Sequence, residues 1–199
     1  MTSESDPAPN DLLLRDALAA HYIAHGLPPN GGANDSWFRV QLGPIRLRLP
    51  NPPARRRALL FHDVNHIATG YNTTFSQGEV AIAAFEVGAG CGRFAIVWLI
   101  NLWGMALGLL CAPRAVFAAF VRGRRSGSIY HDAPALERLA TTSVREIRDR
   151  LQLNQPAGSA RMADVVGFAW WGLVGWALLV LPSAAILAGL WFGVRALLR

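Results

Sequence analysis

The sequence contains no lysine, and charged residues of any kind make up only 16% of its 199 residues. All 19 basic residues are arginines, a bias that points to a GC-rich genome more than to a chemical need. With 52% hydrophobic residues, the chain is apolar for a soluble protein. Its length is sufficient to bury a core, and we expect one domain with an appendage.

Cysteine is also scarce, since only Cys91 and Cys111 are present. If residues 91–111 are largely helical, the two thiols lie about 30 Å apart at the helical rise per residue. A disulfide between them is then excluded, which favours a reduced, cytosolic setting. The first ten residues, MTSESDPAPN, have neither a basic start nor an apolar run, so we expect no signal peptide.

The net charge of +6 fits either a nucleic acid or an anionic membrane surface. Nucleic-acid binding usually requires arginines interleaved with exposed aromatic residues on one patch. Here the arginines gather at 55–57, 122–125 and 145–150, next to or between long apolar segments. We therefore expect a membrane as partner and no nucleic acid.

The first half of the chain predicts two helices around a hairpin. Residues 1–10 are expected to be a disordered tail, followed by a helix from Asp11, its N-cap, to His25. Alternating apolar residues on both sides of Gly43-Pro44 predict a short β-hairpin over residues 37–50. Asn51, as a cap before two prolines, opens a helix that ends at Gly70, and a further helix is expected over 77–87.

Two long apolar segments follow. Residues 94–112 carry no charge, and their length suits either a membrane span or a buried helix. We interpret them as a buried helix, which either lines a slot for an isoprenoid tail or simply packs in the core. Residues 114–122 continue as a helix, and residues 133–153 predict two short helices, the second with a capping box of Ser143 and Glu146.

Residues 165–194 contain no charge and predict a transmembrane helix. Tryptophans stand near both ends, and Pro182 is expected to kink the helix without ending it. The resulting organisation is a tail (1–10), a helical metal-binding domain (11–153), a linker (154–163) and a C-terminal anchor (164–199). The predicted fold class is all-α with a small β-hairpin and one C-terminal transmembrane helix. More arginines precede the span than follow it, which places the main domain on the cytoplasmic side of the inner membrane.

The segment that carries the chemistry runs from Leu59 to Glu86. On a helix, His62 and His66 share a face and can bind one ion, while Asp63 can bind from the flank or orient a histidine. Glu79 begins the next helix after a short loop that can bring it back to the histidines. Two histidines with carboxylates suit zinc, ferrous iron or manganese.

Simpler interpretations of these residues stay open. Ser76 to Glu79 is itself a capping box, so Glu79 can be a helix cap instead of a ligand. Glu86 lies two turns after Glu79 and can either support the ligands from behind, as can Tyr71, or pair with Arg93. His21 and His25 form a second pair at helical spacing, which we assign to an ordinary helix surface. His131 needs no function.

The stretch HDVNHIATGYNTTFSQGEVAIAAFE resembles the HDxxH-x(11)-E signature of the coenzyme Q (ubiquinone) biosynthesis protein four family. The TGY after the second histidine and the GE that opens the next helix also match. Residues 120–153, FVRGRRSGSIYHDAPALERLATTSVREIRDRLQL, are similar to the closing stretch of that family. The sequence departs from the pattern in having twelve residues between His66 and Glu79 and an additional apolar helix after Leu153. We expect a bacterial branch of relatives.

The resemblance implies a helical fold with His62, Asp63, His66 and Glu79 as ligands of a divalent ion, usually zinc, with Fe²⁺ or Mn²⁺ as alternatives. It further implies a prenylated aromatic quinone precursor as substrate and the removal, in some accounts oxidative, of its ring carboxylate. Other quinone-biosynthesis enzymes are implied partners. The alternative is a non-catalytic scaffold that binds a polyprenyl lipid. The sequence leaves open whether the protein is a monomer or a homodimer.

Overall fold

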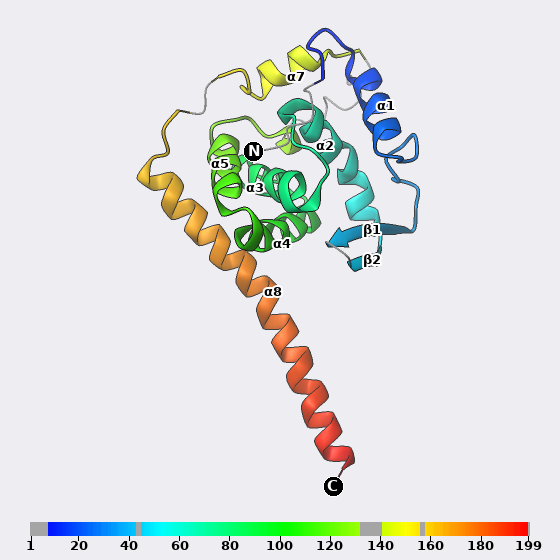
Figure 1. Cartoon of the computed structure of the whole chain (residues 1–199), viewed down its shortest axis with the longest axis vertical. Helices are drawn as coiled ribbons and strands as arrows, with labels where there is room; N and C mark the ends of the chain where they lie inside the picture. The colour runs from blue at the N-terminus through cyan, green and yellow to red at the C-terminus, as the bar shows by residue number, and fades with distance from the viewer. Residues whose placement is uncertain (1–7, 43–44, 132–140, 156–157, 199) are drawn as a thin grey trace.

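The computed structural model describes residues 8–42, 45–131, 141–155 and 158–198. Within them the chain is mainly helical, with one two-stranded antiparallel hairpin and a long apolar C-terminal helix, which confirms the predicted fold class. The elements follow in the order α1 (Leu14–Ala24), β1 (Trp37–Leu42), β2 (Ile45–Pro50), α2 (Pro53–Thr69), η1 (Phe75–Glu79), α3 (Val80–Ala89), α4 (Ala95–Cys111), α5 (Pro113–Arg124), η2 (Ile129–His131), α7 (Val144–Arg150) and α8 (Met162–Leu197) (Figure 1).

The start of α1 differs from the prediction. The helix begins after Leu13 and not at Asp11, because Leu13 is extended and forms an isolated antiparallel bridge with Ser143. This bridge ties the start of α1 to the start of α7, two segments that are far apart in the sequence. Residues 1–7 of the predicted tail lie outside the described residues.

The start of α2 also differs, because Asn51 does not cap it. The side-chain amide of Asn51 donates instead to the carbonyls of Gly32 and Asp35, which leaves Pro52 at the N-cap position. The other end is as predicted. Gly70 has a φ of 79°, a left-handed conformation that costs glycine little, and its N–H donates to the carbonyl of His66.

Helix α3 lies at the centre of the domain and packs against α4 and α5. Two glycines allow α3 and α5 to approach closely. A Cβ atom at Gly88 would lie 2.3 Å from the carbonyl oxygen of Phe120, and one at Gly123 would lie 2.0 Å from that of Phe85. A side chain at either position would push the two helices apart, so the glycines set how closely α3 and α5 pack.

The buried apolar residues form two clusters, one on each side of the predicted metal ligands. The first joins α1, α2, η2 and α7, and the second joins α3, α4 and α5. His62 and His66 on α2 contact Glu86 on α3 and Glu79 on η1, so polar side chains connect these elements. Large members of the first cluster are Leu14, Tyr22, Phe61, Tyr130 and Ile147, and those of the second are Phe85, Leu102, Met105, Val116 and Phe120.

Helix α7 begins with the predicted capping box, in which Ser143 and Glu146 exchange hydrogen bonds. Its Arg148 is buried and donates to the carbonyl of Ala68 at the end of α2. The same guanidinium donates to the carbonyl of Ala8 and the side chain of Asn10, so residues at the end of the predicted tail pack on α7. The first of the two predicted short helices falls largely on residues 132–140, outside the described part of the chain.

Helix α4 is part of the domain, as predicted, but only one of its faces is buried. Asn101 and Met105 point into the core, whereas Trp103 and Leu110 are exposed. The helix packs between α3 and α8 and is shorter than a membrane span. The two cysteines are free, and Cys91 is buried while Cys111 is exposed.

Helix α8 contains 36 residues and is long and apolar enough to cross a membrane. It begins at Met162, continues through Pro182, and its first half packs against α4 and α5. The Trp171 ring stacks on Trp98 of α4 with centroids 4.9 Å apart. The second half projects away from the domain, and every residue from Val180 to Leu198 is exposed (Figure 1).

Candidate metal centre

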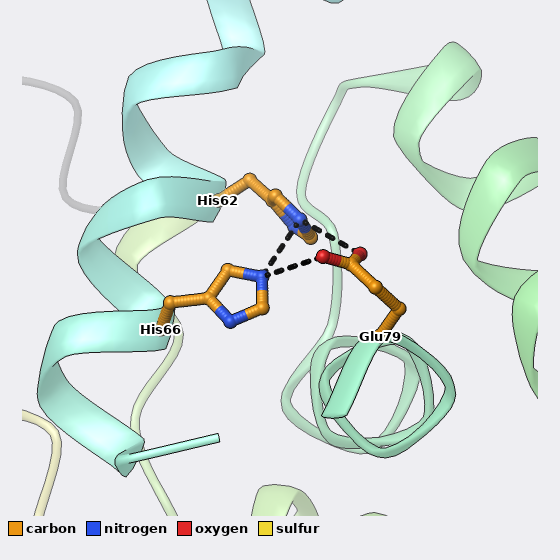
Figure 2. Close-up of side chains that lie close together, drawn as sticks. All are labelled: His62, His66 and Glu79. Carbon is orange, nitrogen blue, oxygen red and sulfur yellow. Dashed lines mark hydrogen bonds and ion pairs between the residues drawn. The ribbon is translucent and has the colours of Figure 1, made fainter. Parts of the chain in front are cut away.

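His62 and His66 lie one turn apart on α2 and direct their rings toward Glu79 (Figure 2). Their Nε2 atoms are 3.2 Å apart. Glu79 places one carboxylate oxygen 3.7 Å from Nε2 of His62 and the other 3.5 Å from Nε2 of His66. The structure thus brings together three of the four predicted ligands from two different elements.

Glu79 reaches this position through η1, a single π-helical turn that precedes α3. Such turns accommodate extra residues within a helix and are frequent at functional sites. Gly78 fixes the turn against the preceding loop, because a Cβ atom there would lie 1.7 Å from the carbonyl oxygen of Asn72. Glu79 makes no side-chain cap bond, so the capping-box alternative is wrong: the carboxylate faces the histidines.

The Glu86 carboxylate supports His62 from behind. It is fully buried and accepts hydrogen bonds from His62 Nδ1 at 3.0 Å, Asn65 Nδ2 at 2.9 Å, Asn101 Nδ2 at 2.5 Å and the Tyr130 hydroxyl at 2.9 Å. Burial opposes ionisation, but the adjacent His62 and these donors outweigh it and hold the pKa of Glu86 below its usual value. Glu86 is therefore an anion that accepts from His62. Glu86 thus contacts His62, and no pairing of Glu86 with Arg93 is found among the described residues.

His66 is oriented by the main chain. Its Nδ1 lies 2.8 Å from the carbonyl oxygen of Tyr71, which can only accept, so Nδ1 must carry the hydrogen. Burial lowers the pKa of His66, which keeps the ring neutral and leaves a lone pair on Nε2. Tyr71 is thus a neighbour of the site as predicted, through its backbone; its ring packs on Phe85 and lies under Arg122.

The charge of His62 follows from the two carboxylates beside it. Burial lowers the pKa of His62, but Glu86 and Glu79 outweigh this effect and raise the pKa well above its usual value. A metal ion that binds both Nε2 atoms therefore has to displace a proton from His62.

Asp63 lies outside this group. Its Oδ2 accepts a hydrogen bond of 2.9 Å from the Tyr22 hydroxyl on α1, and the carboxylate is buried. Burial raises the pKa of Asp63, against the opposing effects of His62 and Tyr22. The Tyr22 contact spans 41 residues of sequence and joins α1 to α2 behind the histidines.

Three residues near the site were not predicted to be there. His21 does not lie on an ordinary helix surface, because its ring stacks on His66 with centroids 5.8 Å apart. Burial and the nearby His66 lower its pKa to about 4, so His21 is neutral. The other two are Asn101 and Tyr130, both donors to Glu86. As the one strongly polar residue in an apolar helix, Asn101 could have been identified from the sequence.

These residues fit a divalent metal ion. Two imidazole nitrogens and one carboxylate oxygen lie within 4.8 Å of one another, and both nitrogens are oriented by a hydrogen bond on the opposite side of the ring. The side chains of His62 and Glu79 are 25% and 33% exposed, whereas that of His66 is 2% exposed. The site is therefore open to solvent on one side. This donor set suits Zn²⁺, Fe²⁺ and Mn²⁺ alike.

No protein-family model, no curated protein and no solved structure matches this chain.

Proposed function

We propose that this chain is a membrane-anchored protein that binds one divalent metal ion through His62, His66 and Glu79. One observation carries the proposal. The Nδ1 atoms of both histidines are already engaged, by Glu86 and by the Tyr71 carbonyl, so that the two Nε2 atoms point at each other and at a carboxylate. Such an arrangement is preorganised for a cation and has no use in apolar packing.

The site is suited to catalysis because three protein donors leave coordination positions open on its exposed side. An ion held there would supply Lewis-acid chemistry, stabilising negative charge on a substrate oxygen. The chain itself adds Arg55, whose guanidinium lies 3.8 Å from the Phe38 ring centroid and donates to Asn51. Burial raises the pKa of Glu79, but His66 and His62, and to a smaller extent this arginine, outweigh that effect and lower the pKa. Arg55 thus provides a positive charge at the site that favours an anionic substrate.

For the substrate we propose a prenylated aromatic acid that loses its ring carboxylate as CO₂. Two features support this choice: the resemblance of residues 62–86 to the quinone-biosynthesis signature, and a helix that can hold the domain at the membrane where a prenyl chain resides. We place the anchor in the cytoplasmic membrane with the domain on the cytoplasmic side, on the basis of Arg145, Arg148, Arg150 and Arg161 before the span.

The rival function is a lipid-binding scaffold with a structural ion. The partial exposure of His62 and Glu79 favours the enzyme, because structural zinc sites are closed by four protein ligands. The two functions differ in their response to chelators. A scaffold whose fold depends on a structural ion should unfold when a chelator removes that ion. An enzyme with a catalytic ion should keep its fold and lose turnover.

The first experiment is elemental analysis of the detergent-purified chain beside a His62→Ala, His66→Ala variant, with thermal melts of both. A His25→Ala, His131→Ala variant is the matched control, since it removes two exposed histidines that do not belong to the His62, His66 and Glu79 group. We expect about one zinc, iron or manganese per chain in the wild type and the control, and none in the site variant with its fold intact. Turnover of prenylated hydroxybenzoates is then assayed. Absence of metal from all three proteins would refute the proposed site.

A further inference from the structure

The direction in which α8 leaves the domain is fixed by its docked first half. Asp164 is buried and pairs with Arg124 and Arg125, each at 3.0 Å. Further along, Gly175 lies so close to α4 that a Cβ atom would come within 2.5 Å of the Leu102 carbonyl oxygen. The domain therefore cannot move freely at the end of a tether. Its orientation relative to the second half of α8 is set by packing.

The exposed half of α8 runs from Val180 to Leu198 and is about 28 Å long at the helical rise per residue. That length matches the hydrocarbon core of a bilayer, with little left over. If this half crosses the membrane, the domain must sit directly on the membrane surface. The side of the domain from which α8 projects then faces lipid.

Figure 1 shows which elements lie on that side. Helix α4 and the β1–β2 hairpin lie toward the projecting half of α8, whereas α1 and α7 lie at the opposite end of the domain. On α4, the exposed side chains are apolar, with Trp103 and Leu110 the largest, and the helix contains no charged residue. An uncharged exposed face of this kind needs a partner that is itself apolar.

The hairpin has the composition of a membrane-interface element. Trp37, Leu47 and Leu49 are exposed on it although they are large and apolar. Arg39, Arg46 and Arg48 are also exposed and share one face of the hairpin with Trp37, whereas Leu47 and Leu49 lie on the other face. Neither strand contains an acidic residue. In the strand register Arg39 lies directly opposite Arg48, and like charges in that arrangement repel. A two-stranded hairpin is marginal on its own, so this one needs an external surface that accepts both arginine and tryptophan.

We propose that the β1–β2 hairpin and the outer face of α4 lie in the headgroup region of an anionic lipid bilayer when α8 spans it. The arginines contact lipid phosphates, and Trp37, Leu47, Trp103 and Leu110 enter the boundary with the acyl chains. Both elements also contact η1, the turn that carries Glu79, so this seating holds the candidate metal centre at the membrane surface. The inference rests on the membrane anchoring in the proposed function and is independent of the metal and of the reaction.

The test is a depth measurement on the full chain in vesicles of phosphatidylcholine with phosphatidylglycerol. Single spin labels are placed, in a Cys91→Ala, Cys111→Ser background, at Leu47→Cys on the hairpin, Ile23→Cys on α1 and Leu187→Cys on the projecting half of α8. Ile23 is the matched control, because it is an exposed aliphatic residue on α1 and belongs to neither the hairpin nor α4. Accessibility to oxygen and to a water-soluble nickel complex reports the depth of each label.

We expect the Leu187 label in the hydrocarbon, the Leu47 label at the headgroup level and the Ile23 label in water. In an Arg39→Gln, Arg46→Gln, Arg48→Gln variant the Leu47 label should move toward water, since each arginine near an anionic leaflet strengthens attachment about fivefold. A buried Leu187 label with Leu47 as water-accessible as Ile23 would overturn this inference and leave the anchor intact. A Leu187 label in water would overturn the anchoring itself. Spin–spin broadening between Leu47 labels would show a second copy covering the hairpin, which also contradicts the proposal.

Discussion

The geometry of the candidate metal centre depends strongly on His66 and the turn that follows it. Gly70 adopts a left-handed conformation that brings the chain back over the end of α2, and Tyr71 then offers its carbonyl to His66 Nδ1. The turn thereby sets the tautomer of the ring and leaves Nε2 free for the site. The turn that ends α2 therefore also orients the His66 ring as a potential metal ligand.

The sequence was sufficient to predict the residues close to one another along the chain. His62 and His66 meet because helical spacing places them on one face, and Glu79 meets them because the connecting loop is short. Asp63 was assigned to the same group by its position beside His62 and by the resemblance to the HDxxH signature, but its carboxylate accepts a hydrogen bond from Tyr22, 41 residues earlier. His21 was missed for the same reason. Which helix packs behind α2 is decided by tertiary contacts that no local pattern encodes.

Replacing Glu86 with glutamine should damage both the fold and the site. The Gln side chain can still accept from His62, but its NH₂ group would face the donors Asn101 and Tyr130. We expect the free energy of unfolding to fall by about 2–4 kcal/mol and the metal affinity to fall about 10- to 100-fold. Urea denaturation and a metal titration measure the two effects. The control is Asp16→Asn, because Asp16 is exposed and its substitution should change stability little. If Glu86→Gln lowered stability no more than this control, the buried network would be contradicted.

Metal affinity should rise with pH in the neutral range. Because the pKa of His62 is raised in the folded protein, His62 is protonated at neutral pH, and the ion competes with that proton. Below the folded pKa the apparent affinity should increase by up to about tenfold per pH unit, with release of one proton per ion. Calorimetric titration with Zn²⁺ in two buffers of different ionisation enthalpy counts the protons. An affinity that does not change with pH would mean that His62 binds no proton there.

At the scale of the elements, patterns of apolar residues were enough to predict the helices and the hairpin. The residues at which the helices begin were predicted less well. Asn51 is a residue type that often caps helices, but its side chain donates to two loop carbonyls instead. Asp11 lies two residues before Leu13, the actual N-cap of α1. The π-helical turn before α3 carries no signal of its own in sequence. It follows from the packing of Gly78 against Asn72, which is a contact between two backbones.

The close crossing of α3 and α5 predicts a large difference between two glycine substitutions. In Gly123→Ala the new methyl group would meet the backbone of Phe85, so the helices must separate, and we expect a loss of about 1–3 kcal/mol. In Gly193→Ala, on the projecting half of α8, nothing lies within 4 Å, and the change should be neutral or slightly stabilising. Thermal unfolding followed by circular dichroism in detergent compares them. Equal melting temperatures would contradict the crossing.

At the scale of the whole molecule, the domain and the first half of α8 form one packed body. The sequence predicted a linker and then an anchor, because residues 165–176 are as apolar as the rest of the span. Apolar composition alone does not distinguish a helix face that packs on another helix from one that faces lipid. The distinguishing features are Asp164, Gly172 and Gly175, which are buried on the face toward the domain.

Substitutions on this face should loosen the domain without removing the anchor. Asp164→Asn keeps an oxygen that can accept from the Arg161 N–H but loses the charge that pairs with Arg124 and Arg125. We expect the docked state to weaken by about 1–2 kcal/mol. Adding Trp171→Ala removes the stack on Trp98 and should weaken it further. Hydrogen exchange in α4 reports docking, and unchanged protection in the double variant would contradict the contact.

The α4–α8 contact also makes the covalent link between the two parts dispensable. A protease that cuts between Gln155 and Arg161 would leave two fragments that still share the tryptophan stack and the Asp164 ion pairs. The cleaved protein should therefore behave as a two-chain complex, with the helical domain retained on the vesicle after the peptide bond is cut. Proteolysis at this point is a poor means of shedding the domain into solution.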